Sequence, residues 1–220
     1  MPQKTSPYLI AILVFNIIPL IGVAYYNWSP FEMFWLFWME TLIISVFNAI
    51  RVLFSQGMRE TGETVKLNFL QAGKYLLLKI IIFLFYSIFI ILFIGFKSNK
   101  EGDSLHTVTT IAFQNLLFNM ALLLSIASNA FYLIKNFFAN GAYRDTLPSD
   151  FPGLFDSRQI VIHVAVVLGA VGSSFLFEKF GNAHYSSIWI ISIFCLVKCF
   201  FEWYSLRTGG SKNMTARTGL

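Results

Sequence analysis

The sequence is poor in charged residues. Asp, Glu, Lys and Arg make up 12% of its 220 residues, whereas 56% are hydrophobic and 25 are phenylalanine. Soluble globular domains contain about 25% charged residues, so this composition excludes a soluble globular domain. We therefore expect a single membrane domain over residues 1–220.

Cysteine is scarce as well, with only Cys195 and Cys199. These two residues lie four positions apart in one apolar run, so on a helix their side chains point the same way and rarely meet disulfide geometry. We interpret them as reduced thiols in the protein interior.

Catalytic and nucleic-acid-binding signatures are absent too. The sequence has no Gly-x-Ser-x-Gly, no His-Glu-x-x-His and no glycine-rich phosphate loop. The net charge of +5 would suit nucleic acid, but the basic residues are scattered over short loops between apolar runs, as in membrane proteins. We expect no nucleic-acid partner, no metal and no cofactor. The absence of these motifs argues against an enzyme but does not decide the question.

Six apolar runs are long enough to cross about 30 Å of hydrocarbon at about 1.5 Å per residue. They predict an all-α, multi-pass membrane protein built as a six-transmembrane-helix bundle. The fourth run would be about 48 Å long as one helix, so it must tilt or project into water. The predicted helices cover residues 7–26, 31–54, 73–96, 107–138, 159–178 and 185–206.

Lys and Arg are divided unequally between the two sides of this predicted bundle. One side, with the two tails and the second and fourth loops, has twelve and the other has three, so both termini are expected in the cytoplasm. The twelve are Lys4, Arg51, Arg59, Lys66, Lys74, Lys79, Lys135, Arg144, Arg158, Arg207, Lys212 and Arg217, and the three are Lys97, Lys100 and Lys179.

The second run carries Glu40 near its middle, Asn48 further along and Arg51 at its far end. An ionisable residue at mid-membrane costs at least about 2.5 kcal/mol, so it is normally kept inside a bundle for a purpose. Glu40 and Arg51 are nearly eclipsed on a helix, so both can face the same interior. Trp28, just before this run, is expected in an interfacial belt.

Two other runs have a distinctive face. Ser125, Asn129, Tyr132 and Asn136 form a polar stripe in the fourth run, which either interhelical hydrogen bonds of about 0.6 kcal/mol each or a ligand-lined groove would explain. Small residues repeat every four positions in the fifth run and predict a close helix contact, within the bundle or across a homodimer. These small residues are Ala165, Gly169 and Ser173.

The predicted topology places the polar residues in the cytoplasmic half, which suggests a cavity open to the cytoplasm or the inner leaflet. Its cations outnumber its carboxylates, so it would favour a carboxylate, a phosphate or another anionic or amphipathic ligand, with membrane lipid one source. Glu40 and His163 would be the proton-active members. The candidate ligand-binding residues are Glu40, Asn48, Arg51, Lys79, Asn129, Tyr132, His163, Lys198 and Glu202.

Two other interpretations stay open. In a structural subunit with no substrate, Lys198 and Glu202 would pair with each other, Arg51 and Lys79 would extend to the membrane surface, and Glu40 would be protonated against a neighbour. In a membrane-embedded enzyme acting on a lipid or isoprenoid phosphate, His163 and Glu40 would serve as acid and base.

Six short motifs carry a family resemblance: W-x-x-F-E from Trp28, F-W-x-E ending at Glu40, N-x-x-R ending at Arg51, G-A-Y-R, R-x-I-V-x-H and L-V-K-x-x-x-E. In this order and spacing the chain resembles the prokaryotic integral membrane family catalogued as domain of unknown function 6498. The resemblance implies an inner (plasma) membrane protein and no particular activity. The matching positions are Trp28, Glu32, Trp38, Glu40, Asn48, Arg51, Arg144, Arg158, His163, Lys198 and Glu202.

The chain departs from that family's pattern at histidine. Family members tend to carry histidines in the third and fourth helices, where this sequence has Phe85, Phe93 and Asn129. His163 is then the one histidine expected inside the membrane, which argues against a bound metal or a bis-histidine haem.

Overall fold

The computed structural model describes residues 7–26, 28, 30–57, 67–92 and 103–151, together with positions 192, 195–197 and 200. All regular structure in this part is helical, as predicted. The predicted helices at 159–178 and 185–206 lie outside the described residues, apart from those isolated positions, so the six-span topology stays a prediction. The elements are α1 (Pro7–Tyr26), α2 (Pro30–Phe54), α3 (Phe69–Phe89), α4 (Asp103–Ile111), α5 (Leu116–Tyr132), the π-helical η2 (Leu133–Ala139) and the 3-10 turns η3 (Ala142–Arg144) and η4 (Pro148–Asp150).

Three helical stretches of the described chain are long and apolar enough to cross a membrane: Phe31–Phe54, Phe69–Leu92 and Thr107–Ala139. The bounds of α1 and α2 agree with the predicted 7–26 and 31–54 to within one residue. The third helix begins at Phe69, four residues before the predicted start at 73.

The predicted helix over 107–138 agrees with the membrane-length stretch Thr107–Ala139, but it is divided, because the α-helix breaks after Ile111. Phe113 has a φ of 57°, in the left-handed region, and Asn119 Nδ2 donates to its carbonyl at 2.6 Å. Asn115 then caps α5, since its Oδ1 accepts from the Phe118 N–H at 3.1 Å. The side chains of Asn115 and Asn119 therefore organise this break.

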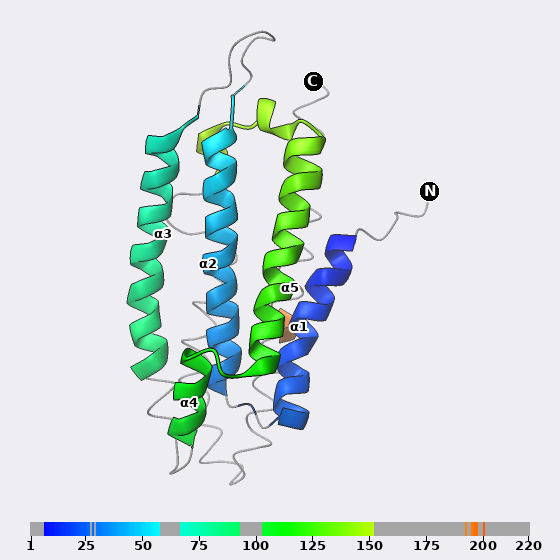
Figure 1. Ribbon diagram of the computed structural model, residues 1–220, viewed down its shortest axis with the longest axis vertical. Helices are drawn as coiled ribbons and strands as arrows, with labels where there is room; N and C mark the ends of the chain where they lie inside the picture. Colours follow the sequence, from blue (N-terminus) through cyan, green and yellow to red (C-terminus); the bar gives the residue numbers. More distant parts are fainter. Residues whose placement is uncertain are drawn as a thin grey trace.

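Figure 1 shows α2 between α3 on one side and α5 on the other, with α1 against α5 and the short α4 beside the start of α2. Trp38 hydrogen bonds with Ser87, and Asn48 with Tyr75, so α2 and α3 are antiparallel. This central position explains why 61% of the α2 span is buried, against 22% of the α3 span.

Ring contacts at both ends of α2 set its direction relative to α5. Trp28 lies against Phe118 at 6.4 Å between ring centroids, and Phe54 lies against Phe138 at 5.3 Å. The two helices are therefore parallel. To find the α2 residue that lies level with a given residue of α5, about 80 to 90 is subtracted from its number.

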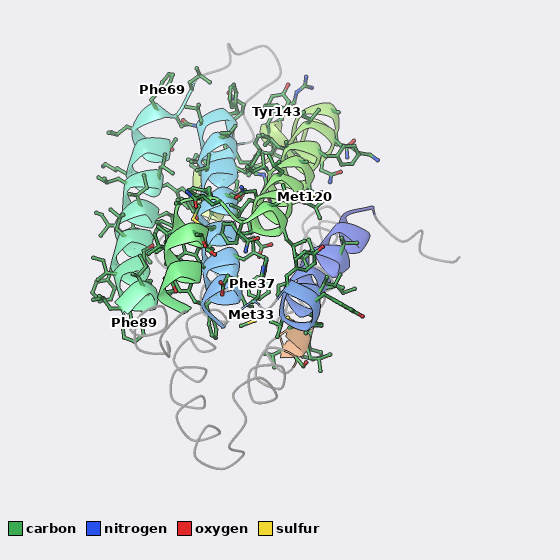
Figure 2. All side chains as sticks on the ribbon, turned by 60° about the horizontal axis from the view of Figure 1, so that its bottom comes forward. Met33, Phe37, Phe69, Phe89, Met120 and Tyr143 are labelled. Atoms are coloured by element: carbon green, nitrogen blue, oxygen red, sulfur yellow. The ribbon has the colours of Figure 1, made fainter. Side chains whose placement is uncertain are left out.

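The first half of α2 builds an aromatic core. All eight residues from Phe31 to Trp38 are buried, and Figure 2 labels two of them, Met33 and Phe37, near the start of α2. The Trp38 ring stacks on Phe83 at 5.6 Å, and its Nε1 donates to the Phe83 carbonyl and to Ser87 Oγ, each at 3.1 Å. Trp28 also belongs to this core, with 4% of its surface exposed, so it packs against protein, and its interfacial depth stays a prediction. Its indole packs on Gly22, where a Cβ atom would lie 2.4 Å from the ring.

The opposite end of α2 is fixed by backbone hydrogen bonds. The Gln56 N–H donates to the Tyr143 carbonyl at 2.8 Å and the Gly57 N–H to the Thr146 carbonyl at 3.0 Å. Asn68, just before α3, donates through Nδ2 to the Ser55 carbonyl at 2.6 Å. The segment after η2 and the start of α3 thus hold the last turn of α2, which carries Arg51.

Candidate functional site

Arg51 is half-buried in the last turn of α2, where it contacts Asn48 and Tyr132. Its Nη1 donates to Asn48 Oδ1 at 2.8 Å, one turn earlier on the same helix. The guanidinium carbon lies 4.9 Å from the ring centroid of Tyr132 on α5. A desolvated cation–π contact contributes about 2 kcal/mol, so the two contacts together fix the orientation of the guanidinium.

Asn48 connects Arg51 to α3. Its Nδ2 donates to the Tyr75 hydroxyl at 3.4 Å, and Lys79 Nζ lies 5.5 Å from the centroid of the Tyr75 ring. Lys79 is only 1% exposed. The alternative in which Lys79 extends to the membrane surface is therefore wrong, because its ammonium group lies inside the bundle.

These contacts join side chains of three helices, which we call the polar cluster. It contains two cations, two tyrosine rings and one amide. Because α3 and α5 flank α2 on opposite sides, the cluster bridges the bundle near the end where α2 finishes (Figure 1). Its members are Asn48, Arg51, Tyr75, Lys79 and Tyr132.

The polar stripe of α5 extends from this cluster towards mid-bundle. Ser125, Asn129 and Tyr132 fall within about 60° of one another on a helical wheel, and Tyr132 faces α2 through its contact with Arg51. Ser125 and Asn129 are both buried, and Asn129 Nδ2 donates to the Ser125 carbonyl at 2.9 Å. The side chains of Ser125 and Asn129, between the polar cluster and the middle of the bundle, are thus also polar.

Glu40 lies on the same side of α2 as Arg51, about 20° away around the helix and about 16 Å along its axis. It is 9% exposed and lies within about a turn of the level of Ser125. The antiparallel register with α3 places Lys79 level with residues 44–46, between one and two turns from Glu40. Glu40 therefore marks the inner end of a strip of polar residues that begins at Arg51.

The structure thus brings four of the predicted ligand-binding residues, Asn48, Arg51, Lys79 and Tyr132, into one cluster, with Asn129 and Glu40 beneath it. Tyr75 and Ser125 were not among the predicted site residues, although Tyr75 lies one turn from Lys79 and Ser125 one turn from Asn129. The predicted members His163, Lys198 and Glu202 lie outside the described residues, as do the seam residues Ala165, Gly169 and Ser173.

Arg144 provides a second arginine at the same end of α2, in a different setting. It is exposed, with its guanidinium carbon 5.6 Å from the centroid of the Tyr143 ring. The hydrogen bond from its Nε to the Tyr143 hydroxyl raises the pKa of Arg144, so this group stays protonated. It differs from Arg51 in lying outside the polar cluster.

The described chain is a helical protein with membrane-length helices and a buried cationic cluster. It belongs to the Family of unknown function (DUF6498), whose model matches residues 2–217, and this confirms the resemblance seen in the sequence. No curated protein and no solved structure matches the chain. Any function must therefore be argued from the cluster itself.

Proposed function

We propose that this protein is a small transporter or binder that takes an anionic or amphipathic ligand at the polar cluster. In this proposal the chain crosses a prokaryotic inner membrane six times, with both termini in the cytoplasm. The excess of Lys and Arg in one set of flanking segments supports that orientation. The cluster would then lie in the cytoplasmic half.

The observation that carries the proposal is the setting of Arg51. Asn48 Oδ1 and the Tyr132 ring contact the guanidinium and orient it. The second cation of the cluster, Lys79, comes from another helix and is almost fully buried. Oriented arginines bind carboxylate and phosphate oxygens through two parallel hydrogen bonds, which suits an anion at this place.

The remaining predicted residues complete the proposal. His163, Lys198 and Glu202 would line the same site, with Lys198 a third cation and His163 and Glu40 the groups that exchange protons during transport. Membrane lipid phosphate is a natural source of the anion, because the surfaces of α3 and α5 that face outward are apolar.

Binding of hexadecyl phosphate to the protein in phosphatidylcholine nanodiscs tests the anion site. Arg51→Gln should weaken binding at least about tenfold, since a charge-assisted bidentate contact contributes about 1.5–3 kcal/mol. Arg144→Gln is the matched control, because it removes the same charge beside a tyrosine ring at an exposed position. Equal effects of the two variants, or none from Arg51→Gln, would refute the site.

Glu40→Gln distinguishes a transporter from a structural subunit. The substitution removes the ionisable group but keeps the shape, so uptake of hexadecyl phosphate into proteoliposomes should stop while the melting temperature stays close to wild type. A lower melting temperature with unchanged uptake would instead assign Glu40 to packing alone.

A further inference from the structure

Hydroxyl groups on the described helices usually bond back to their own helix. Ser45, Ser55 and Ser87 each donate to the carbonyl four residues earlier, all at 2.7 Å. Such bonds satisfy a buried hydroxyl without any partner from another helix. They are the expected state of a serine in an apolar bundle.

Ser125 departs from this pattern. It is 3% exposed, and its Oγ has no hydrogen-bond partner among the residues that the structure describes. Its carbonyl is well used, because it accepts from Asn129 Nδ2 at 2.9 Å and from Ser128 Oγ at 3.0 Å. A buried hydroxyl left unsatisfied costs about 1–3 kcal/mol, so this orientation needs a reason outside the helix.

The place of Ser125 gives that reason. It shares the face of α5 that carries Tyr132, and it lies about 10 Å further along the axis. Since Arg51 sits over the Tyr132 ring, the orphan hydroxyl lies on the same side of the bundle as the guanidinium but deeper. An elongated ligand suits two groups that are set apart in this way along the bundle axis better than the compact inorganic phosphate ion does.

We propose that Ser125 donates a hydrogen bond to a second oxygen of the same ligand, which is therefore an elongated anionic lipid. Its phosphate would lie at Arg51, and an ester or hydroxyl oxygen of its backbone would reach Ser125. This inference rests on the proposed anion site and narrows its ligand from any anion to a lipid phosphate with a glycerol-like backbone.

Two lipids test the inference with the protein in phosphatidylcholine nanodiscs. Lysophosphatidic acid carries a phosphate, a glycerol hydroxyl and an ester, whereas hexadecyl phosphate carries the phosphate and chain alone. Ser125→Ala should weaken binding of lysophosphatidic acid about five- to tenfold, the effect of one lost hydrogen bond, and leave hexadecyl phosphate binding unchanged. Ser125→Thr restores a hydroxyl and should restore affinity for lysophosphatidic acid.

The matched control is Ser128→Ala, whose hydroxyl already bonds to the Ser125 carbonyl. It should leave the binding of both lipids unchanged. Folding of Ser125→Ala is checked by its melting temperature without added lipid, which should equal or exceed that of wild type, because the lost hydroxyl has no partner and alanine favours helix.

The outcomes separate this inference from the proposed function. If Arg51→Gln weakens both lipids while Ser125→Ala binds lysophosphatidic acid like wild type, the contact at Ser125 is refuted and the anion site stands. Equal weakening of both lipids by Ser125→Ala also refutes it, since that result indicates a general distortion. If Arg51→Gln affects neither lipid, the proposed function fails and this inference fails with it.

Discussion

The two halves of α2 differ in how they are held. From Phe31 to Trp38 every residue is buried, and the Trp38 ring contacts α3, while Trp28 just before the helix contacts α5. From Glu40 to Arg51 the helix instead presents polar side chains, and directional bonds such as that of Arg51 to Asn48 set their positions. The same helix thus has an aromatic half that packs, with Glu32 as its one buried carboxyl group, and a polar half whose directional bonds position its side chains.

This difference has an energetic meaning. Burial of a large apolar side chain contributes about 1.5–3 kcal/mol without demanding a fixed orientation, so the aromatic half can stabilise the bundle. A hydrogen bond contributes only about 1 kcal/mol net but fixes an angle and a distance. We therefore expect substitutions in the aromatic half to change stability, and substitutions in the polar half to change binding.

The largest effect should come from Trp38→Ala. It removes a stacked ring and both hydrogen bonds of the indole, so the free energy of unfolding in detergent should fall by about 3–5 kcal/mol. Trp38→Phe keeps a ring and should cost less. A loss under about 1 kcal/mol in Trp38→Ala would show that the aromatic half does not hold the bundle.

The next largest should come from Gly22→Ala. The added Cβ would lie 2.4 Å from the buried Trp28 ring, so the ring must move, at a cost of about 1–3 kcal/mol in thermal unfolding. Gly73→Ala is the matched control on α3, because nothing lies within 4 Å of a Cβ there and alanine favours helix. Equal melting temperatures for the two variants would contradict close packing between α1 and Trp28.

Asn48→Ala should change ligand affinity more than stability, unlike the two substitutions above. It removes the 2.8 Å partner of Arg51, so hexadecyl phosphate affinity in nanodiscs should fall about three- to tenfold while unfolding changes by about 1 kcal/mol. Unchanged affinity would mean that Asn48 does not position the guanidinium.

The smallest effect should come from Ser45→Ala. This hydroxyl lies in the polar half of α2 but bonds to its own helix, at the Thr41 carbonyl. Unfolding should change by less than about 0.5 kcal/mol, with lipid affinity at the wild-type value. A clear loss of affinity would extend the ligand contacts beyond the face that carries Asn48 and Arg51.

Sequence reasoning predicted the parts of this structure that depend on local pattern. Apolar runs place α1 and α2, and the three-residue spacing of Asn48 and Arg51 already puts them one turn apart. The contact of Arg51 with Tyr132 depends on how α2 and α5 pack in register, which periodicity within one run does not encode. The break at Phe113 was missed because an asparagine in an apolar run can either cap a helix or bond to a neighbouring helix. The sequence alone does not distinguish these two roles.

In the proposed transporter, the position of Arg51 in the last turn of α2 bears on how the ligand leaves. The carbonyl end of a helix carries roughly half a negative charge, which partly offsets a guanidinium placed there. An arriving anion consequently meets less than a full positive charge, so exchange should stay fast enough for turnover. A transporter must release the ligand that it binds, and a guanidinium whose positive charge is partly offset favours that release.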